Sequence, residues 1–261
     1  MKVLEKVSPV DYLFKRSGLS KTKIKDAMKK GAVWYKKKGR SRRLRRATSI
    51  LESGSYISIY YDQATLDTKP IEPQILYREK NFSVWSKPSG LLCGGTRFGD
   101  HCAINRIVER ISNKPSFLVH RLDRYARGIL VIAHTKRAAR TISMQFQERK
   151  VKKRYEAVVH NVLKKSCVID ASIDNRRAIS RISPIGNDGV NSLVSIEIET
   201  GRKHQIRKHM SGIGFPIVGD RRYGSKSTED LKLISVFLGF NHPEKKYPVS
   251  FELPKEQRLG L

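Results

Sequence analysis

The chain has 261 residues, 39% of them hydrophobic, so it is long and apolar enough to fold around a large core. Its 53 lysines and arginines outnumber its 24 acidic residues, for a formal net charge of +29. This composition argues against extended disorder and favours nucleic acid as a polyanionic partner. An anionic membrane as partner, or a basic surface that serves only solubility, are the alternatives. We expect no membrane span, because no apolar run approaches about 20 residues, and no signal peptide, because the start "MKVLEKVSPV" lacks an apolar core.

The spacing of the cysteines and histidines argues against disulfide bonds and against a metal site. Cys93, Cys102 and Cys167 include no C-x-x-C pair, which suits reduced thiols in a cytoplasmic protein. The histidines and cysteines together also lack the paired ligand spacing of a zinc site. We therefore expect a cytoplasmic protein that binds no metal.

The first 60 residues form a strongly basic segment with an apolar pattern of its own. They contain 17 lysines and arginines against four acidic residues. In "SKTKIKDAMKKG", Ser20 can cap a helix that Gly31 ends. "AVWY" and "SYISIYYD" are typical of strands, and the basic run "KKKGRSRRLRR" between them predicts a loop. Residues 1–61 are therefore expected to form a module of two short helices and a small sheet.

The cations of this module are candidates for contacts with nucleic acid. Lys21, Lys25 and Lys29 are spaced four residues apart and share one helix face. A solvated face and a binding face explain that helix equally well, but the arginine-rich loop beside it favours contacts with phosphate. The candidate RNA-binding residues of the module are Lys21, Lys25, Arg42, Arg43, Arg45 and Arg46.

A second domain is expected over residues 74–261, after a linker over residues 62–73 that has two prolines and little periodicity. "ILYREKNFSVW" predicts two strands joined by a turn, and Asp100 can cap a helix through "INRIVERI". "ILVIAH" predicts a buried strand, "TKRAARTISMQFQERK" a helix, and "LVSIEIET" a strand of an antiparallel sheet with one wet face. The expected fold class is α+β.

The sequence has neither a P-loop nor a G-x-S-x-G elbow, so we expect no nucleotide cofactor and a reaction carried by side chains alone. In "HRLDRYARGI", Asp123 lies among Arg121, Arg124 and Arg127, directly before a buried strand. "GRKHQIRKHM" offers further guanidinium groups. A guanidinium beside a carboxylate keeps it ionised and oriented, as a nucleophile requires. From the residues alone, Asp123 could equally well serve only to neutralise buried arginines.

Five segments, in order, resemble the motifs of the RluA-like pseudouridine synthases. They are "VWSKPSGLL", "HRLDRYARGILV", "KRYEAVV", "GRKHQIRKHM…FPIVGDRRYG" and "NHP…FELP", and together they cover residues 74–254. Residues 8–61 more loosely resemble the alpha-L RNA-binding module of ribosomal proteins. The resemblance implies a catalytic domain with a large, mainly antiparallel sheet and a central cleft.

Carried over residue by residue, the resemblance makes Asp123 the catalytic aspartate, Arg207 its salt-bridge partner and Tyr155 the aromatic that stacks on the target base. Arg121 would fill the space left by the flipped uridine. From its strand pattern alone, Tyr155 is more often a core residue. The other residues implied at the site, as cleft walls or RNA contacts, are Lys87, Pro88, Arg124, Arg127, Arg202 and His204. A purely structural role for Lys87 and Pro88 is left open.

The implied reaction is isomerisation of uridine to pseudouridine within structured RNA, without a cofactor, by a monomeric enzyme. Large-subunit ribosomal RNA is the expected substrate and transfer RNA the alternative. Asp123 could attack the sugar, attack the base or remove a sugar proton. Two departures from the family pattern, Ala126–Arg127 for Thr-Ser and Leu233–Ile234–Ser235 for Leu-His-Ala, remove no group that the reaction needs.

Two other functions are compatible with the residues. One is a non-catalytic RNA-binding or ribosome-assembly factor on the same fold. The other is a hydrolase that releases the free base, which would need a second carboxylate to activate water. Glu156 and Asp220 are the candidates for that second carboxylate.

Overall fold

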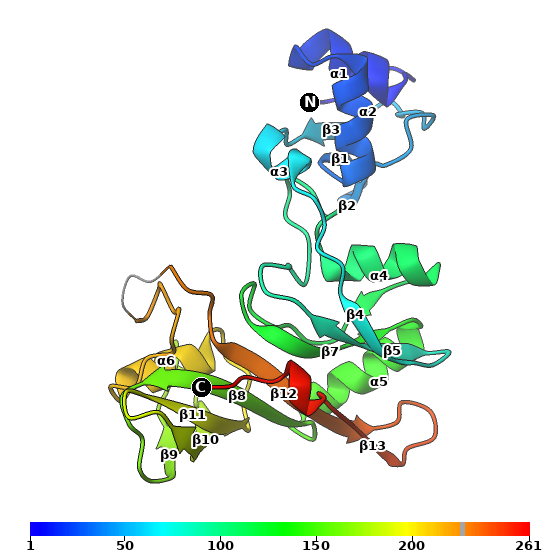
Figure 1. Ribbon diagram of the computed structural model, residues 1–261. Helices are drawn as coiled ribbons and strands as arrows, with labels where there is room; N and C mark the ends of the chain where they lie inside the picture. The colour runs from blue at the N-terminus through cyan, green and yellow to red at the C-terminus, as the bar shows by residue number, and fades with distance from the viewer. Residues whose placement is uncertain (225–227) are drawn as a thin grey trace. The chain divides into compact units, whose positions relative to one another are not determined.

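The computed structural model describes residues 1–224 and 228–261, which form two compact units. Unit 1 contains Met1–Pro70 and Gly94–Ile107, and unit 2 contains Ile71–Cys93 and Val108–Leu261 (Figure 1). The chain therefore enters unit 2, returns to unit 1 and then completes unit 2. The sequence pattern suggested one crossing, over residues 62–73, and gave no sign of this return.

Unit 1 is two helices on a small antiparallel sheet, with strand order β2-β1-β3. As expected, the side chain of Ser20 caps the second helix and Gly31 ends it with a left-handed backbone. The run expected as a basic loop contains the strand β2, which pairs with β1 over four residues. The elements are α1 (Pro9–Ser17), α2 (Lys21–Lys30), β1 (Val33–Lys37), β2 (Arg40–Arg43), β3 (Tyr56–Ile59) and α3 (Gln63–Asp67).

Two parts of unit 1 differ from the sequence interpretation. The short helix α3 falls inside the expected linker, and its Leu66 is buried in the core of unit 1 with Leu13 and Ile57. Asp100 was expected to cap the helix that follows it, but its carboxylate pairs instead with Arg43 (Nε to Oδ2, 3.2 Å) and with Arg45. These ion pairs hold the returning segment, and sequence spacing alone could not reveal them.

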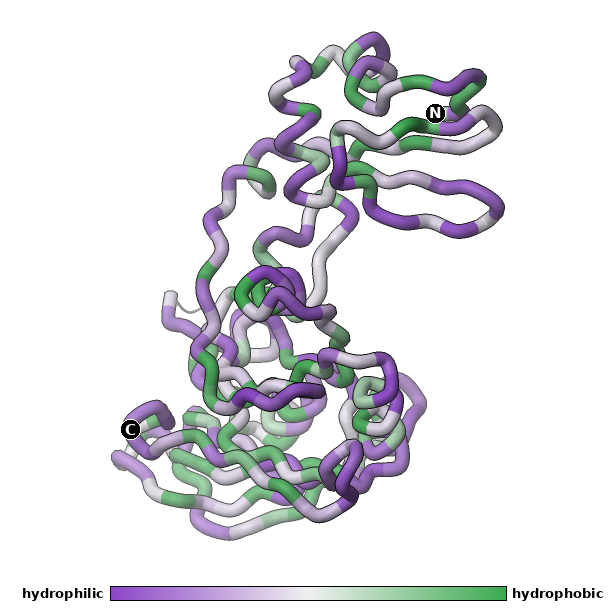
Figure 2. Tube along the Cα trace, turned by 90° about the vertical axis from the view of Figure 1, so that its right-hand side faces the viewer, coloured by the Kyte–Doolittle hydropathy of each residue, from purple (hydrophilic) through white to green (hydrophobic). Residues whose placement is uncertain are grey.

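Unit 2 is built on a ten-stranded sheet in the order β4-β5-β7-β12-β8-β11-β10-β9, with β6 paired to β7 and β13 to β12. The expected α+β fold with a large, mainly antiparallel sheet is confirmed. Figure 2 shows hydrophobic and hydrophilic residues interspersed along the chain. The strands are β4 (Gln74–Arg78), β5 (Phe82–Lys87), β6 (Phe117–Leu118), β7 (Arg127–Ala133), β8 (Lys152–His160), β9 (Cys167–Asp170), β10 (Ile179–Asn187), β11 (Asn191–Ile198), β12 (Leu233–Asn241) and β13 (Pro248–Glu252).

The helices of unit 2 cover the sheet. Ala138 and Ile142 of α5 (Lys136–Gln147) pack with Ile129 and Val131 of β7 and with Val236 of β12 in one apolar core. On the other half of the sheet, α6 (Gln205–Gly212) is tied to β10 by polar side chains. The chain also forms α4 (Ile104–Ser112) and the short helix η1 (Lys255–Gln257).

The two halves of this sheet meet at a short parallel pairing of β7 with β12. It joins Arg127 to Ile234 and Gly128 to Ser235, and every other strand pair in the described sheet is antiparallel. Gly128 has a φ of +103°, and a Cβ there would collide with the backbone of Ser235. The functional residues lie beside this junction, so the close approach that glycine permits sets their spacing.

We predict that Gly128→Ala lowers the free energy of unfolding by about 2–4 kcal/mol, because a left-handed backbone and a backbone collision are combined at one residue. Gly189→Ala is the matched control. Gly189 also has a positive φ, of +90°, but nothing lies within 4 Å of its Cβ position. It should lose only about 1 kcal/mol. Urea unfolding measures both, and equal losses would show that the junction tolerates the methyl group.

Candidate active site

A buried lysine holds the loop that carries Asp123 through hydrogen bonds to its backbone. Lys87, at the end of β5, is fully buried and donates hydrogen bonds to the carbonyl oxygens of Pro88 (3.0 Å), Leu91 (2.9 Å) and Arg124 (2.9 Å). Burial lowers the pKa of Lys87 to about 8. The last of these bonds anchors the residue after Asp123. Lys87 therefore positions the loop and has no surface to offer to RNA.

The expected ion pair between Asp123 and Arg207 is present. Arg207, on α6, lies with its Nη1 3.4 Å from Oδ2 of Asp123, and Nε2 of His204 lies 3.7 Å from Oδ1. The Asp123 side chain is 26% exposed, and the side chains of Arg207 and His204 are largely buried. Burial lowers the pKa of His204 despite the nearby carboxylate. Arg207 is therefore the main cation that faces Asp123.

Arg207 is itself held by a second carboxylate. Asp220 accepts two hydrogen bonds from this guanidinium, from Nε (2.8 Å) and Nη2 (2.7 Å), and further bonds from the backbone N–H groups of Arg222 and Tyr223. Burial alone would raise the pKa of Asp220, but these bonds outweigh it and lower the pKa. The two-pronged pair leaves Nη1 directed at Asp123. The sequence pattern missed this positioning role, although "GDRRYG" lies within a family motif.

Tyr155 lies on β8, beside the junction of the two sheet halves. It pairs in register with Ser235 of β12 and is only 8% exposed. Burial and the negative charge of Asp123 raise the pKa of its hydroxyl, so the phenol stays neutral at physiological pH. Tyr155 thus offers an aromatic ring and an uncharged hydroxyl near Asp123.

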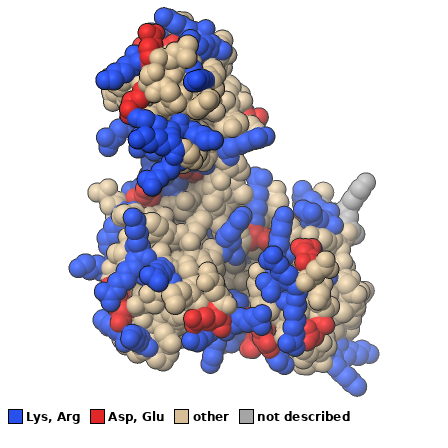
Figure 3. Space-filling model, turned by 180° about the vertical axis from the view of Figure 1, so that it is seen from behind, with Lys and Arg blue, Asp and Glu red and all other residues tan. Residues whose placement is uncertain are grey.

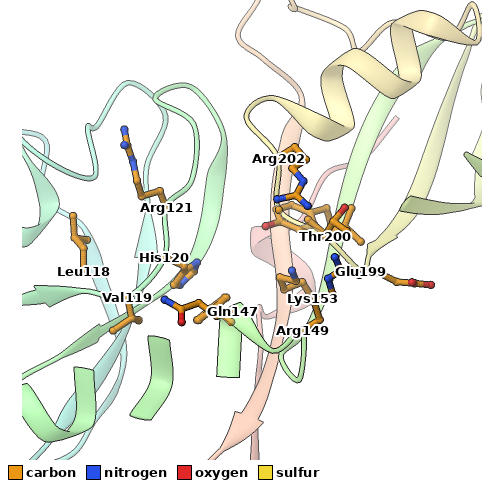
Figure 4. A pocket seen from close by; sticks show the side chains of 14 residues that line it. Leu118, Val119, His120, Arg121, Gln147, Arg149, Lys153, Glu199, Thr200 and Arg202 are labelled. Carbon is orange, nitrogen blue, oxygen red and sulfur yellow. The ribbon is translucent and has the colours of Figure 1, made fainter. Parts of the chain in front are cut away.

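These groups line one small cavity. Asp123, Tyr155, His204 and Arg207 all border a space of about 90 Å³, floored in part by Leu233. It shares Arg121, Tyr155, Ile198, Gly201 and Arg202 with a larger cavity of about 660 Å³. Figure 4 shows the larger cavity, with His120 and Arg121 on one side and Lys153, Thr200 and Arg202 on the opposite side. A small recess thus adjoins a wide basic opening.

The larger cavity is basic, and burial lowers the pKa of two of its titratable groups. Lys153 has no acidic or hydrogen-bond partner among the described residues, and burial lowers its pKa to about 8. His120 accepts a hydrogen bond from the N–H of Val131 (3.0 Å) and stacks on Phe146, and burial and the charge of Lys153 lower its pKa to about 3. His120 is therefore a neutral structural group, whereas Lys153 faces the cavity without a counter-ion.

The other candidate residues divide into exposed cations and cations with internal partners. Arg121 and Arg124 of the Asp123 loop are exposed, and Arg202 borders both cavities. Arg43 and Arg45 of unit 1 are held by Asp100, which reduces what they can offer to RNA. Arg127 is half-buried at the start of β7. Lys21, Lys25, Arg42 and Arg46 are exposed, and Lys21 also pairs with Asp11 (2.6 Å).

The described part of the chain supports neither a metal site nor a membrane-spanning helix. Residues 1–224 and 228–261 contain no cluster of three or more His, Cys, Asp or Glu side chains that could hold a metal ion. Over the same residues, no helix combines the length and the apolar character needed to cross a membrane.

Comparison with known proteins assigns the class. Residues 81–212 match the family model described as RNA pseudouridylate synthase. The chain is 30% identical to an "Uncharacterized RNA pseudouridine synthase" of Aquifex aeolicus, covering 91% of this chain and 86% of the relative. It is 32% identical to "Ribosomal large subunit pseudouridine synthase C" of Buchnera aphidicola, covering 69% and 66%. The protein is thus an RNA pseudouridine synthase and belongs to the RluA-like family.

The fold is also similar to that of a pseudouridine synthase structure. The solved structure of "Human RNA Pseudouridylate Synthase Domain Containing 1" superposes with a TM-score of 0.62 at 21% identity, covering 72% of this chain and 86% of that one. The family resemblance read from the five motifs is therefore confirmed. The likeness of the first 61 residues to an alpha-L module stays a prediction.

We predict that Asp220→Asn and Asp123→Asn separate support from chemistry. Removing the charge of Asp220 leaves Arg207 buried and poorly paired, which should lower the free energy of unfolding by about 3 kcal/mol. Asp123 makes a longer contact and is partly exposed, so Asp123→Asn should change it by less than about 1 kcal/mol. Urea unfolding of both variants is the measurement. Equal effects would contradict the order of support from Asp220 through Arg207 to Asp123.

A second prediction concerns Lys153 and pH. Its pKa of about 8 in the folded protein lies below the ordinary value of 10.5. The unfolded chain therefore binds more protons between these values, and stability should rise as pH increases from about 8 to about 10.5. Lys153→Met should flatten this rise and stabilise the protein at pH 7 by about 2–3 kcal/mol. Urea unfolding at several pH values tests this, and an unchanged slope would show that Lys153 is solvated.

Proposed function

We propose that Asp123 is the catalytic aspartate of a cofactor-free isomerisation of uridine to pseudouridine within RNA. The observation that carries the proposal is the convergence of Asp123, Arg207 and Tyr155 on one cavity of about 90 Å³. These residues come from a loop, a helix and a strand that are far apart in the sequence. An oriented carboxylate, a fixed cation and a neutral phenol are groups that act without a metal or an organic cofactor.

Each group has a distinct part in the proposed reaction. Arg207 holds Asp123 at the recess, and Tyr155 supplies the ring on which the target base stacks. Arg121 is exposed at the shared rim of both cavities, where it can enter the RNA stack in place of the flipped nucleotide. Unstacking the base costs a few kcal/mol, and these contacts offset that cost.

The proposed reaction leaves the elemental composition of the substrate unchanged. Asp123 assists cleavage of the bond between the ribose C1′ and N1 of uracil. The detached base turns within the recess and C5 bonds to C1′. The proton on C5 passes to solvent, and N1 takes up a proton. Reactants and product are isomers, so no oxidant, reductant or energy source is consumed.

The hydrolase alternative loses its second carboxylate. Asp220 is buried in its pair with Arg207, and Glu156 is buried and pairs with Arg258 (3.4 Å). Neither side chain borders the recess that holds Asp123. Neither of these two candidate acids is therefore free to activate a water molecule beside a flipped nucleotide, which favours isomerisation over release of the base.

Large-subunit ribosomal RNA is the proposed substrate. Two considerations support it: a relative bears the name "Ribosomal large subunit pseudouridine synthase C", and the chain carries a net charge of +29. Figure 3 shows lysine and arginine side chains spread over both units on the face in view. Mapping the pseudouridines missing from a deletion strain identifies the RNA, and a missing site in transfer RNA alone would replace this proposal. A monomeric state and a cytoplasmic location also stay predictions.

We predict that Asp123→Asn slows the release of tritium from RNA labelled at C5 of uridine by at least about 100-fold, while RNA binding is retained. Asp174→Asn is the matched control, because Asp174 is an exposed residue whose side chain pairs with Lys208. Its rate should equal that of the unchanged protein. Free uracil among the products would favour the hydrolase, and tritium release by Asp123→Asn at the normal rate would exclude Asp123 from catalysis.

A further inference from the structure

The open face of the small sheet in unit 1 carries aromatic side chains that its core does not use. In β1, Val33 and Tyr35 point into the core, while Trp34 and Lys36 alternate onto the opposite face. Register places Lys36 opposite Tyr56 of β3. Tyr56 is 47% exposed, so its ring is accessible on this face.

This face is concave and basic. It borders a cavity of about 450 Å³ whose lining includes three aromatic residues and two basic side chains but no acidic residue among those described. The lining residues are Met1, Trp34, Lys36, Ser41, Tyr56, Ser58, Tyr60 and Arg97. Unit 1 as a whole has 20 lysines and arginines against seven acidic residues. Its charge therefore suits a polyanion, and its aromatic rings suit a partner with flat faces.

The rings are held in place by neighbouring cations. The guanidinium of Arg43 lies 4.4 Å from the centre of the Trp34 ring, and the Trp34 indole N–H donates to the carbonyl oxygen of Arg97 (3.1 Å). The Arg97 guanidinium lies 5.3 Å from the centre of the Tyr60 ring. Fixed aromatic rings interleaved with cations are the arrangement on which unpaired bases stack while their phosphates are neutralised.

We propose that this sheet face, defined by Trp34, Lys36, Tyr56, Tyr60 and Arg97, binds unpaired nucleotides of the RNA substrate. The inference rests on the proposed function only in that the substrate is RNA. Double-stranded RNA does not fit the proposal, because its bases stack on one another and present no face to Tyr56 or Trp34. The face lies on the other side of the sheet from the core that receives α1 and α2, so it is distinct from the lysine face of α2.

The test is a binding titration of the full chain carrying Asp123→Asn, with a single-stranded oligocytidine of about 12 nucleotides, which offers no uridine to the catalytic cavity. The chain has two tryptophans, and Trp85 is buried in unit 2, so Trp34 should dominate any quenching by stacked bases. We expect quenching that Trp34→Phe abolishes, and affinity for the oligocytidine that falls about ten-fold in Tyr56→Ala.

Salt dependence separates stacking from phosphate contact. Lys36→Ala should reduce the slope of log K against log salt by about one, whereas Tyr56→Ala should leave that slope unchanged. Phe14→Ala is the matched control, because Phe14 is 47% exposed like Tyr56 but lies on α1. It should bind the oligocytidine as the parent does.

Three results would overturn the inference. They are unchanged affinity in Tyr56→Ala, an equal loss in Phe14→Ala, or equal weakening by Tyr56→Ala for an RNA duplex of the same length. Failure of the proposed function would show in a different experiment, as the absence of tritium release by the unchanged enzyme. Binding by this face does not depend on that reaction, so the two failures are distinguishable.

Discussion

The active site depends on one buried ion pair. Asp220 accepts two hydrogen bonds from Arg207, of 2.8 and 2.7 Å, in a place where neither charge could remain alone. Once Arg207 is fixed in this way, its remaining nitrogen is directed at Asp123, 3.4 Å away. The longer contact leaves Asp123 partly exposed, as its proposed catalytic role requires. One arginine is thus shared by a buried acid that holds it and a partly exposed acid that it faces.

The sheet junction supplies the space in which these groups meet. Parallel pairing limited to Gly128 and its neighbour lets the strands diverge, so that the Asp123 loop and Tyr155 border the same opening. Lys87 completes the arrangement by fixing the backbone of Arg124. The recess is therefore a consequence of topology as much as of side chains.

Sequence reasoning found what local patterns and motifs encode. Helix caps such as Ser20, the strand around Ile129 and the pairing of Asp123 with Arg207 were all predictable, the last through the family motifs. What it missed depends on contacts between distant residues. Asp220 positions Arg207 because α6 places the two side chains beside each other in space. Asp100 pairs with Arg43 and Arg45 and does not cap the helix that follows it. Such contacts have no periodicity to detect.

The excess of positive charge has a physical cost that RNA can remove. A net charge of +29 opposes compaction, and Lys153 shows the cost at one residue, since burial alone lowers its pKa to about 8. A phosphate entering the cavity of about 660 Å³ would raise that pKa again and relieve the strain of a cation without a partner. If RNA binds there as proposed, charge that destabilises the free protein contributes to affinity for the substrate. The surface and the cavity would then both be more favourable with RNA bound than without it.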